Sequence, residues 1–114
     1  MSRTRTDPSI RHRMCGRLKR LLCIAYDDNW TQLSERLGYA DKSGIQAMLA
    51  GRSFLDVQRL EKLSSWAVEG GYVPSLHWIV SGHGPALLLL ADGKIVDTLE
   101  LDELAKRRAL TRKV

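Results

Sequence analysis

The chain has 114 residues, of which 44% are hydrophobic and 27% are charged. This balance predicts one compact globular domain and excludes the core-poor composition of a disordered chain. The formal net charge is +5, but it is unevenly spread. Residues 1–20 hold seven bases and one acid and residues 106–114 hold five bases and no acid, whereas residues 21–105 hold six bases and twelve acids. Basic ends favour a polyanion such as nucleic acid or an anionic membrane surface, and they equally suit solubilising tails.

The cysteines and the hydrophobic runs bear on the compartment. Cys15 and Cys23 fall in one expected helix, where their spacing puts them about 12 Å apart along the axis, too far for a disulfide. The longest apolar run, residues 85–91, is too short for a membrane span, and no apolar stretch of a signal peptide follows the Arg-rich start. We therefore expect a cytoplasmic protein that does not enter a membrane.

Hydrophobic residues recur at helical spacing from residue 8 onward. The first helix opens with Asp7 and Pro8, a capping side chain followed by a residue preset for the first helical turn. Its apolar stripe is Ile10, Met14, Leu18, Leu21, Leu22 and Ala25. A second helix is capped by Asn29 and ends at Gly38, where a left-handed backbone costs little. The residues that it points inward are Trp30, Leu33 and Leu37.

Two further short helices follow. The third begins after Asp41 and ends at Gly51, and its inward residues are Ile45, Met48 and Leu49. The fourth is capped by Asp56 and is broken at residues 70–71, a pair of glycines. Its expected buried residues are Val57, Leu60, Leu63 and Ala67.

The pattern changes after a fifth helix. That helix opens at residues 74–75, Pro then Ser, contains Leu76, Ile79 and Val80, and ends at Gly82. Residues 86–90 and 94–101 then read as two strands joined by the Asp-Gly turn at residues 92–93, because Asp-Gly tolerates the positive φ angles of a tight turn. The first strand is apolar on both faces, which suggests burial against the helices, against a second chain, or both.

The second and third helices have the pattern of a helix-turn-helix. They are short, the turn contains a glycine, Ser34 is small where the next helix must cross, and Ile45 anchors that helix. A steep crossing lets the second helix of the pair stand out from the body and enter a major groove. Many helical proteins contain such a pair, so the pattern alone favours DNA binding only slightly over plain core packing.

Two segments resemble a known family. The segment SGIQAMLAG at residues 43–51 resembles the recognition helix of the lambda-repressor-like proteins, and LHWIVSGHGP at residues 76–85 resembles the closing fifth helix of the phage CI repressor helix-turn-helix family. With the order of the helices, the resemblance covers residues 8–85. It implies a mainly α-helical, five-helix, lambda-repressor-like domain that binds operator DNA as a dimer.

The resemblance also places four residues toward the DNA bases, namely Lys42, Ser43, Gln46 and Ala47. Their chemistry agrees, because Gln pairs bidentately with adenine, Lys donates to guanine, Ser donates or accepts, and the Ala methyl meets a thymine methyl. Without that resemblance, Lys42 and Gln46 would be read as two solvated side chains on a helix surface.

Phosphate contacts are expected from other residues. The stronger candidates are Thr31 and Gln32 at the start of the second helix and Arg52 just past the third. Two arginines of the first helix, Arg17 and Arg20, are weaker candidates. Residues 1–7 form a basic arm whose Arg3 and Arg5 either lie along the duplex or contact nothing.

The motifs of enzyme and metal chemistry are missing. The chain has no Gly-x-Ser-x-Gly motif, no paired-His zinc motif and no phosphate-binding glycine loop. Its two cysteines lack the spacing of metal ligands. We expect no enzyme activity, no metal and no cofactor.

We therefore expect a transcriptional regulator, a phage or prophage repressor in the bacterial cytoplasm and nucleoid, that binds a palindromic operator in double-stranded DNA as a homodimer. Residues 86–114, the hairpin and a tail that forms a last basic helix at residues 102–110, are the expected dimerisation element. The expected interface residues are Leu87, Leu88, Leu89, Leu90, Ile95 and Val96. Two alternatives stay open: an interaction module such as an antitoxin or anti-repressor that uses the hairpin, and an RNA binder, which needs exposed aromatic residues from a chain with only 6%.

Overall fold

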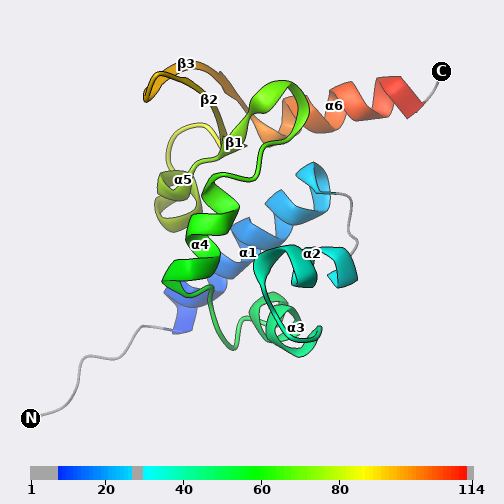
Figure 1. Ribbon diagram of the computed structural model, residues 1–114, viewed down its shortest axis with the longest axis vertical. Coiled ribbons are helices and arrows are strands. Elements are labelled where there is room, and N and C mark those ends of the chain that lie inside the picture. Colours follow the sequence, from blue (N-terminus) through cyan, green and yellow to red (C-terminus); the bar gives the residue numbers. More distant parts are fainter. Residues whose placement is uncertain (1–7, 27–29, 113–114) are drawn as a thin grey trace, which may run out of the picture.

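The computed structural model describes residues 8–26 and 30–112. Within them the chain is mainly helical, as predicted, and adds a small three-stranded antiparallel sheet (Figure 1). The elements are α1 (Pro8–Ala25), α2 (Trp30–Leu37), α3 (Ser43–Leu49), α4 (Val57–Ser64), a 3-10 turn (Glu69–Gly71), β1 (Val73–Pro74), α5 (Leu76–Ser81), β2 (Leu87–Ala91), β3 (Lys94–Leu99) and α6 (Leu101–Arg112). None of the helices in the described part of the chain has the length and hydrophobicity needed to cross a membrane.

Helix α1 lies at the centre of the fold. Its apolar stripe is buried from Leu18 to Ala25, and Cys15 is buried beside it; helices α3, α5 and α6 pack against α1. Ile10, expected inward, is exposed because it lies in the first turn of α1, before the covering helices begin. The buried core therefore joins residues from every part of the described chain, from Cys15 to Leu104.

The local signals for helix ends are confirmed where they can be observed. The Asp56 carboxylate accepts a hydrogen bond from the backbone N–H of Arg59 at 3.0 Å, and the Ser75 hydroxyl accepts one from the N–H of Trp78 at 3.3 Å. Both side chains satisfy helix N–H groups that have no partner within the helix. Gly38, Gly51 and Gly82 close α2, α3 and α5 at φ values of 87°, 79° and 77°. The caps expected from Asp7 and Asn29 lie outside the described residues.

Helix α4 differs from the prediction in its length and in the residues that it buries. Helix α4 ends at Ser64 and not at the glycine pair, because the backbone N–H of Val68 bonds to the carbonyl of Tyr72 at 2.7 Å and turns the chain toward the sheet. Ala67 lies beyond the helix and is exposed. Val57 was expected to be buried and is also exposed, because it is the first residue of the helix.

The predicted hairpin is present, and a third strand joins it. Residues 92 and 93 form the turn with φ values of 53° and 75°, as the Asp-Gly pair predicted. Strand β1 pairs with β2, so the sheet order is β1-β2-β3. The sequence did not reveal β1, which has only two residues. Strand β3 ends at Leu99, and the apolar residue Leu101, expected in the strand, begins α6 instead.

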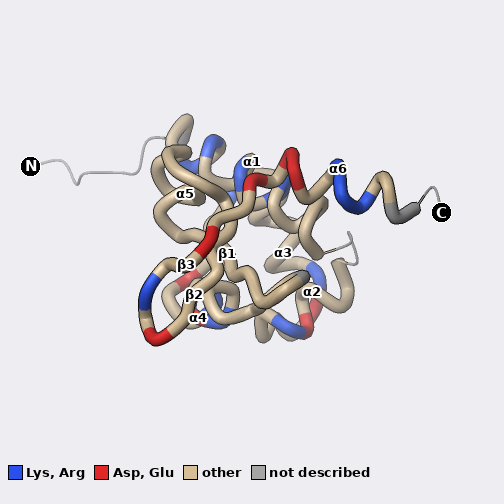
Figure 2. The backbone as a smooth tube through the Cα atoms, turned by 90° about the horizontal axis from the view of Figure 1, so that it is seen from above, with Lys and Arg blue, Asp and Glu red and all other residues tan. Residues whose placement is uncertain are grey.

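Helix α6 packs against α1. Leu101 and Leu104 are buried, and the guanidinium of Arg108 donates to the carbonyl oxygen of Ala25 at 2.9 Å and to that of Ile24. A positive charge at the end of α1 also complements its dipole. The last basic helix is therefore present, and its first half shares the core of the domain. Its C-terminal half extends away from the body (Figures 1 and 2).

Candidate nucleic-acid interface

Helix α3 buries one face and exposes the other. Ile45 and Met48 are fully buried, while Lys42, Ser43 and Gln46 are exposed and Ala47 is half-buried. Ser34 is buried on α2, so a small side chain lies on the inward face of that helix, as predicted. Helix α3 lies at the opposite end of the molecule from the hairpin and α6 (Figure 1). The four candidate base-contacting residues thus gather at the start and along the outer side of one helix.

Asp41 organises the start of α3. Its carboxylate accepts hydrogen bonds from the hydroxyl and, at 2.8 Å, from the backbone N–H of Ser43. These two bonds hold the pKa of Asp41 below its usual value, so the group stays charged at neutral pH. The Ser43 hydroxyl already donates to Asp41, which leaves its oxygen as an acceptor toward any ligand.

Tyr39 fixes the turn between α2 and α3. Its ring lies so close to the backbone of Gly44 that a Cβ atom at that position would overlap the ring. The guanidinium of Arg59 covers the same ring, with its carbon 4.0 Å from the ring centre. The turn is therefore held by one aromatic ring packed between the first turn of α3 and an arginine of α4.

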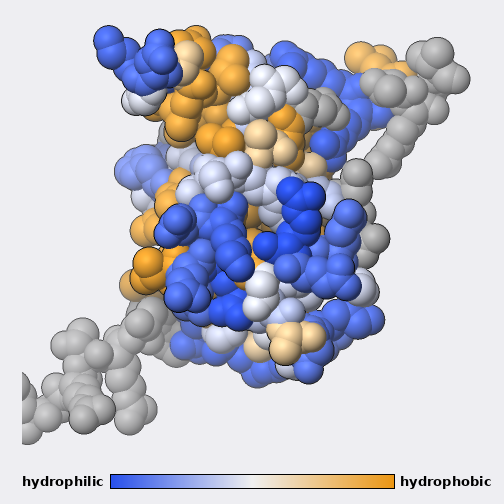
Figure 3. All heavy atoms as spheres, in the orientation of Figure 1, coloured by the Kyte–Doolittle hydropathy of each residue, from blue (hydrophilic) through white to orange (hydrophobic). Residues whose placement is uncertain are grey.

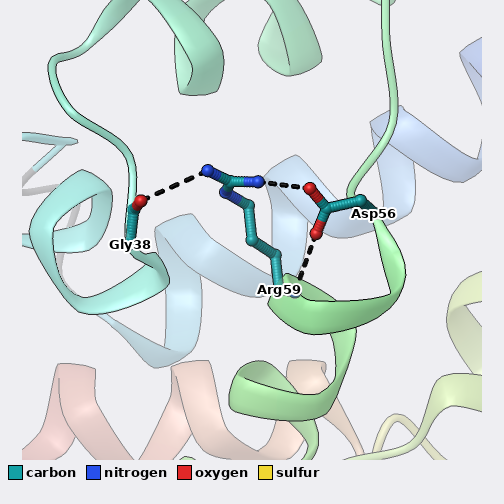
Figure 4. A network of polar contacts seen from close by, with 3 residues as sticks. All are labelled: Gly38, Asp56 and Arg59. Carbon is teal, nitrogen blue, oxygen red and sulfur yellow. Dashed lines mark hydrogen bonds and ion pairs between the residues drawn. The ribbon is translucent and has the colours of Figure 1, made fainter.

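Arg59 ties α4 to this turn (Figure 4). One terminal nitrogen pairs with Asp56 and the other donates to the carbonyl oxygen of Gly38 at 3.2 Å. The turn before α3 is thus tied to α4 by a planar group with several donors, which lysine cannot replace. Neither Arg59 nor Tyr39 was predicted from the sequence. The spacing of three between Asp56 and Arg59 signals a local ion pair, but no local pattern reveals a contact across 21 residues.

The candidate phosphate-contacting residues fall into two groups. Thr31 and Gln32, in the first turn of α2, and Arg52, just past α3, are exposed. Arg17 instead donates to the carbonyl oxygens of Ile79 and Val80 at 2.8 and 2.7 Å, and Arg20 pairs with Asp102. These two arginines join α1 to the end of α5 and to the start of α6, which accounts for their position without DNA. Arg3 and Arg5 lie outside the described residues.

The expected interface residues of the hairpin differ in how far they are exposed. Leu87 is fully buried inside the chain, so its assignment to an intermolecular contact is wrong, because the base of the hairpin lies on the helices. Leu88 and Leu89 are half-buried. Leu90, Ile95 and Val96 are 48%, 58% and 58% exposed, and hydrophobic residues gather on the surface at this end of the molecule (Figure 3).

Lys106, Arg107 and Arg108 follow one another along α6 (Figure 2), which lies at the opposite end of the molecule from α3 (Figure 1). Among the described residues, no group of three or more His, Cys, Asp or Glu side chains could hold a metal ion.

Comparison with known proteins gives no relative for this chain. No protein family, no curated protein and no solved structure matches it.

Proposed function

We propose that the chain is a sequence-specific regulator that binds double-stranded DNA through α3, in a domain of the lambda-repressor-like type. The observation that carries the proposal is the division of α3, whose one face is fully buried while Lys42, Ser43 and Gln46 are exposed. A helix that is anchored on one side and polar on the other suits insertion into a major groove, which is wide enough for a helix. The restraint of its first turn by Tyr39 and Arg59 supports a fixed docking angle.

The exposed side chains of α3 suggest how bases are read. Gln46 pairs with the N6 and N7 edge of adenine, Lys42 donates to guanine, and the Ala47 methyl contacts a thymine methyl. Ser43 accepts from a base amine, because its own proton is donated to Asp41. Thr31, Gln32 and Arg52 contact backbone phosphates, and Arg3 and Arg5 follow the duplex ahead of α1. No cofactor is required for any of these contacts.

We further propose that the protein acts as a homodimer on a palindromic operator. Helix α3 has only seven residues, and so short a helix buries too little surface for tight binding to one half-site. Two linked copies bind two half-sites about one helical turn apart. The exposed apolar residues of the hairpin, Leu90, Ile95 and Val96, supply the contact between copies. In this proposal the protein is a phage or prophage repressor that acts on nucleoid DNA in the bacterial cytoplasm.

A second candidate function keeps the fold but uses the hairpin to capture another protein, as an antitoxin or anti-repressor does. The same exposed apolar residues favour it. Salt separates the two functions, because a phosphate-dominated contact weakens steeply as salt rises while an apolar contact does not.

Selection of bound sequences from a random duplex pool tests the proposal. We expect enrichment of a palindrome whose half-site spacing reports the dimer. The double variant Lys42→Ala, Gln46→Ala should enrich none, while Gln58→Ala, an exposed change on α4, should enrich the same site as the unmodified chain. Absence of any enriched sequence, together with salt-insensitive capture of a protein partner, would favour the second function. Preferential binding of single-stranded RNA in competition would contradict both.

A further inference from the structure

A basic cleft lies beside the far end of α3. It has a volume of about 370 Å³ and lies between the first half of α1 and the connection from α3 to α4. Its lining residues are Arg11, Met14, Arg52, Ser53 and Phe54, which include two arginines and no acid. Among the described residues, the lining of the cleft therefore has two positive side chains and no negative one, next to the helix that we propose to enter DNA.

Arg11 is held in place within this cleft. Its Nε donates to the carbonyl oxygen of Gly51 at 2.8 Å. Gly51 is buried at φ 79°, and a Cβ atom there would lie 2.7 Å from the ring of His12, so α1 approaches this backbone closely. The terminal nitrogens of Arg11 make no hydrogen bond or ion pair with another described residue. An arginine fixed through Nε presents the remaining donors of its planar fork, the geometry that matches a phosphate.

Part of the lining of the cleft is apolar. Met14 and Phe54 are half-buried there, and Ser53 adds a hydroxyl. A free anion would contact only the two arginines and leave the apolar residues without a partner. Binding of an acidic peptide would not require a site beside α3. A phosphodiester carries its charge next to deoxyribose carbons, so it suits both halves of the lining.

We propose that this cleft binds a backbone phosphate of the same duplex whose major groove receives α3, with Arg11 and Arg52 on the phosphate and Met14 and Phe54 against the adjoining sugar. The proposal rests on the function proposed above and adds Arg11, which no signal in the sequence marked. It makes the C-terminal end of α3 a second anchoring point, so that phosphate contacts flank the helix from both ends and set its register on the duplex.

Salt-dependent binding of the full chain to duplex DNA tests this assignment. The variants are Arg11→Gln, Arg52→Gln and their combination, measured by fluorescence anisotropy on a selected duplex and on a random one. Glutamine retains an amide that can donate to the Gly51 carbonyl, so the fold is kept, as circular dichroism and thermal melting will check. Lys106→Gln removes one charge from the exposed side of α6, far from α3, and serves as the matched control.

We expect each cleft variant to weaken binding severalfold and by the same factor on both duplexes, and to lower the slope of log affinity against log salt by about 0.9 per lost phosphate contact. The control should keep the slope of the unmodified chain. Slopes that stay unchanged in folded cleft variants, or losses confined to the selected sequence, would overturn the assignment while leaving the proposed function intact. If the unmodified chain binds no duplex, both proposals fail together, and that result is distinguishable from the first.

Discussion

The aromatic ring of Tyr39 occupies the space that a side chain at Gly44 would need. This relationship links the turn after α2 to the first turn of α3, and Arg59 completes it from α4. Three segments of the chain meet at this ring, so the direction of α3 depends on it.

Gly44→Ala should destabilise the protein. Alanine favours a helix over glycine by up to about 1 kcal/mol, but overlap with the Tyr39 ring costs about 1–3 kcal/mol. Gly16→Ala is the matched control, because that helical glycine in α1 has no atom within 4 Å of an added Cβ. Chemical denaturation should show a loss for Gly44→Ala and a gain for Gly16→Ala. Equal gains for both would mean that Tyr39 moves aside at no cost.

The Asp56 cap of α4 should make the protein less stable at acid pH. The hydrogen bond from the backbone N–H of Arg59, followed by the charge of Arg59, holds the pKa of Asp56 below its ordinary value of 3.8. A carboxyl group whose pKa is lowered by folding stabilises the folded state above its unfolded pKa, and this contribution is lost as the pH falls through the folded value. Asp56→Asn keeps a capping side chain without the charge. Denaturation at a series of pH values should show that the free energy of unfolding falls less steeply at acid pH in this variant. If the two profiles are identical, Asp56 does not cause the loss of stability in acid.

Gln46→Ala should change DNA specificity and not stability. Loss of a bidentate contact costs about 1–3 kcal/mol on the preferred site and relaxes the choice at one base pair. The side chain is exposed, so thermal melting should stay unchanged. Repeating the duplex selection with this variant measures the effect, and Gln58→Ala is the control. A uniform loss across all sequences would assign Gln46 to the backbone instead.

Charges on the hairpin should separate the copies of a dimer. Leu90 and Ile95 are cross-strand partners, so the double variant Leu90→Glu, Ile95→Lys removes two exposed apolar side chains and places opposite charges across from each other. The hairpin should persist, and sedimentation velocity should report a monomer. Leu110→Glu changes an apolar residue of α6 that is 67% exposed and should leave the assembly unchanged. A folded dimer that survives the double variant would place the interface elsewhere.

The two thiols should differ in reactivity. Burial raises the pKa of Cys15, and its Sγ lies 3.2 Å from the carbonyl oxygen of Ser53, whereas Cys23 is only half-buried. The thiolate is the reactive form, so Cys15 should resist alkylation at neutral pH. Timed labelling followed by peptide mass analysis should find Cys23 modified first. If a cysteine-reactive dye labels both thiols at the same rate, α1 opens readily near Cys15.

Much of this protein follows from local patterns in its sequence. The stripe of α1, the caps at Asp56 and Ser75 and the Asp-Gly turn act between residues close in the chain, so composition and spacing are enough to predict them. The division of α3 into a buried and an exposed face follows in the same way, because helical spacing alone separates Ile45 and Met48 from Gln46.

Only the tertiary structure decided which arginines and leucines remain at the surface. Arg17 reaches carbonyls 62 and 63 residues away and Arg20 an acid 82 residues away, so both are engaged within the chain although the sequence offered them for phosphate. Leu87 and Leu90 belong to one apolar strand, yet the first lies under the helices and the second is exposed. Packing between distant segments determines contacts of this kind, and no local sequence pattern contains them. The contacts of Arg11 and Arg59 arise from the same long-range packing.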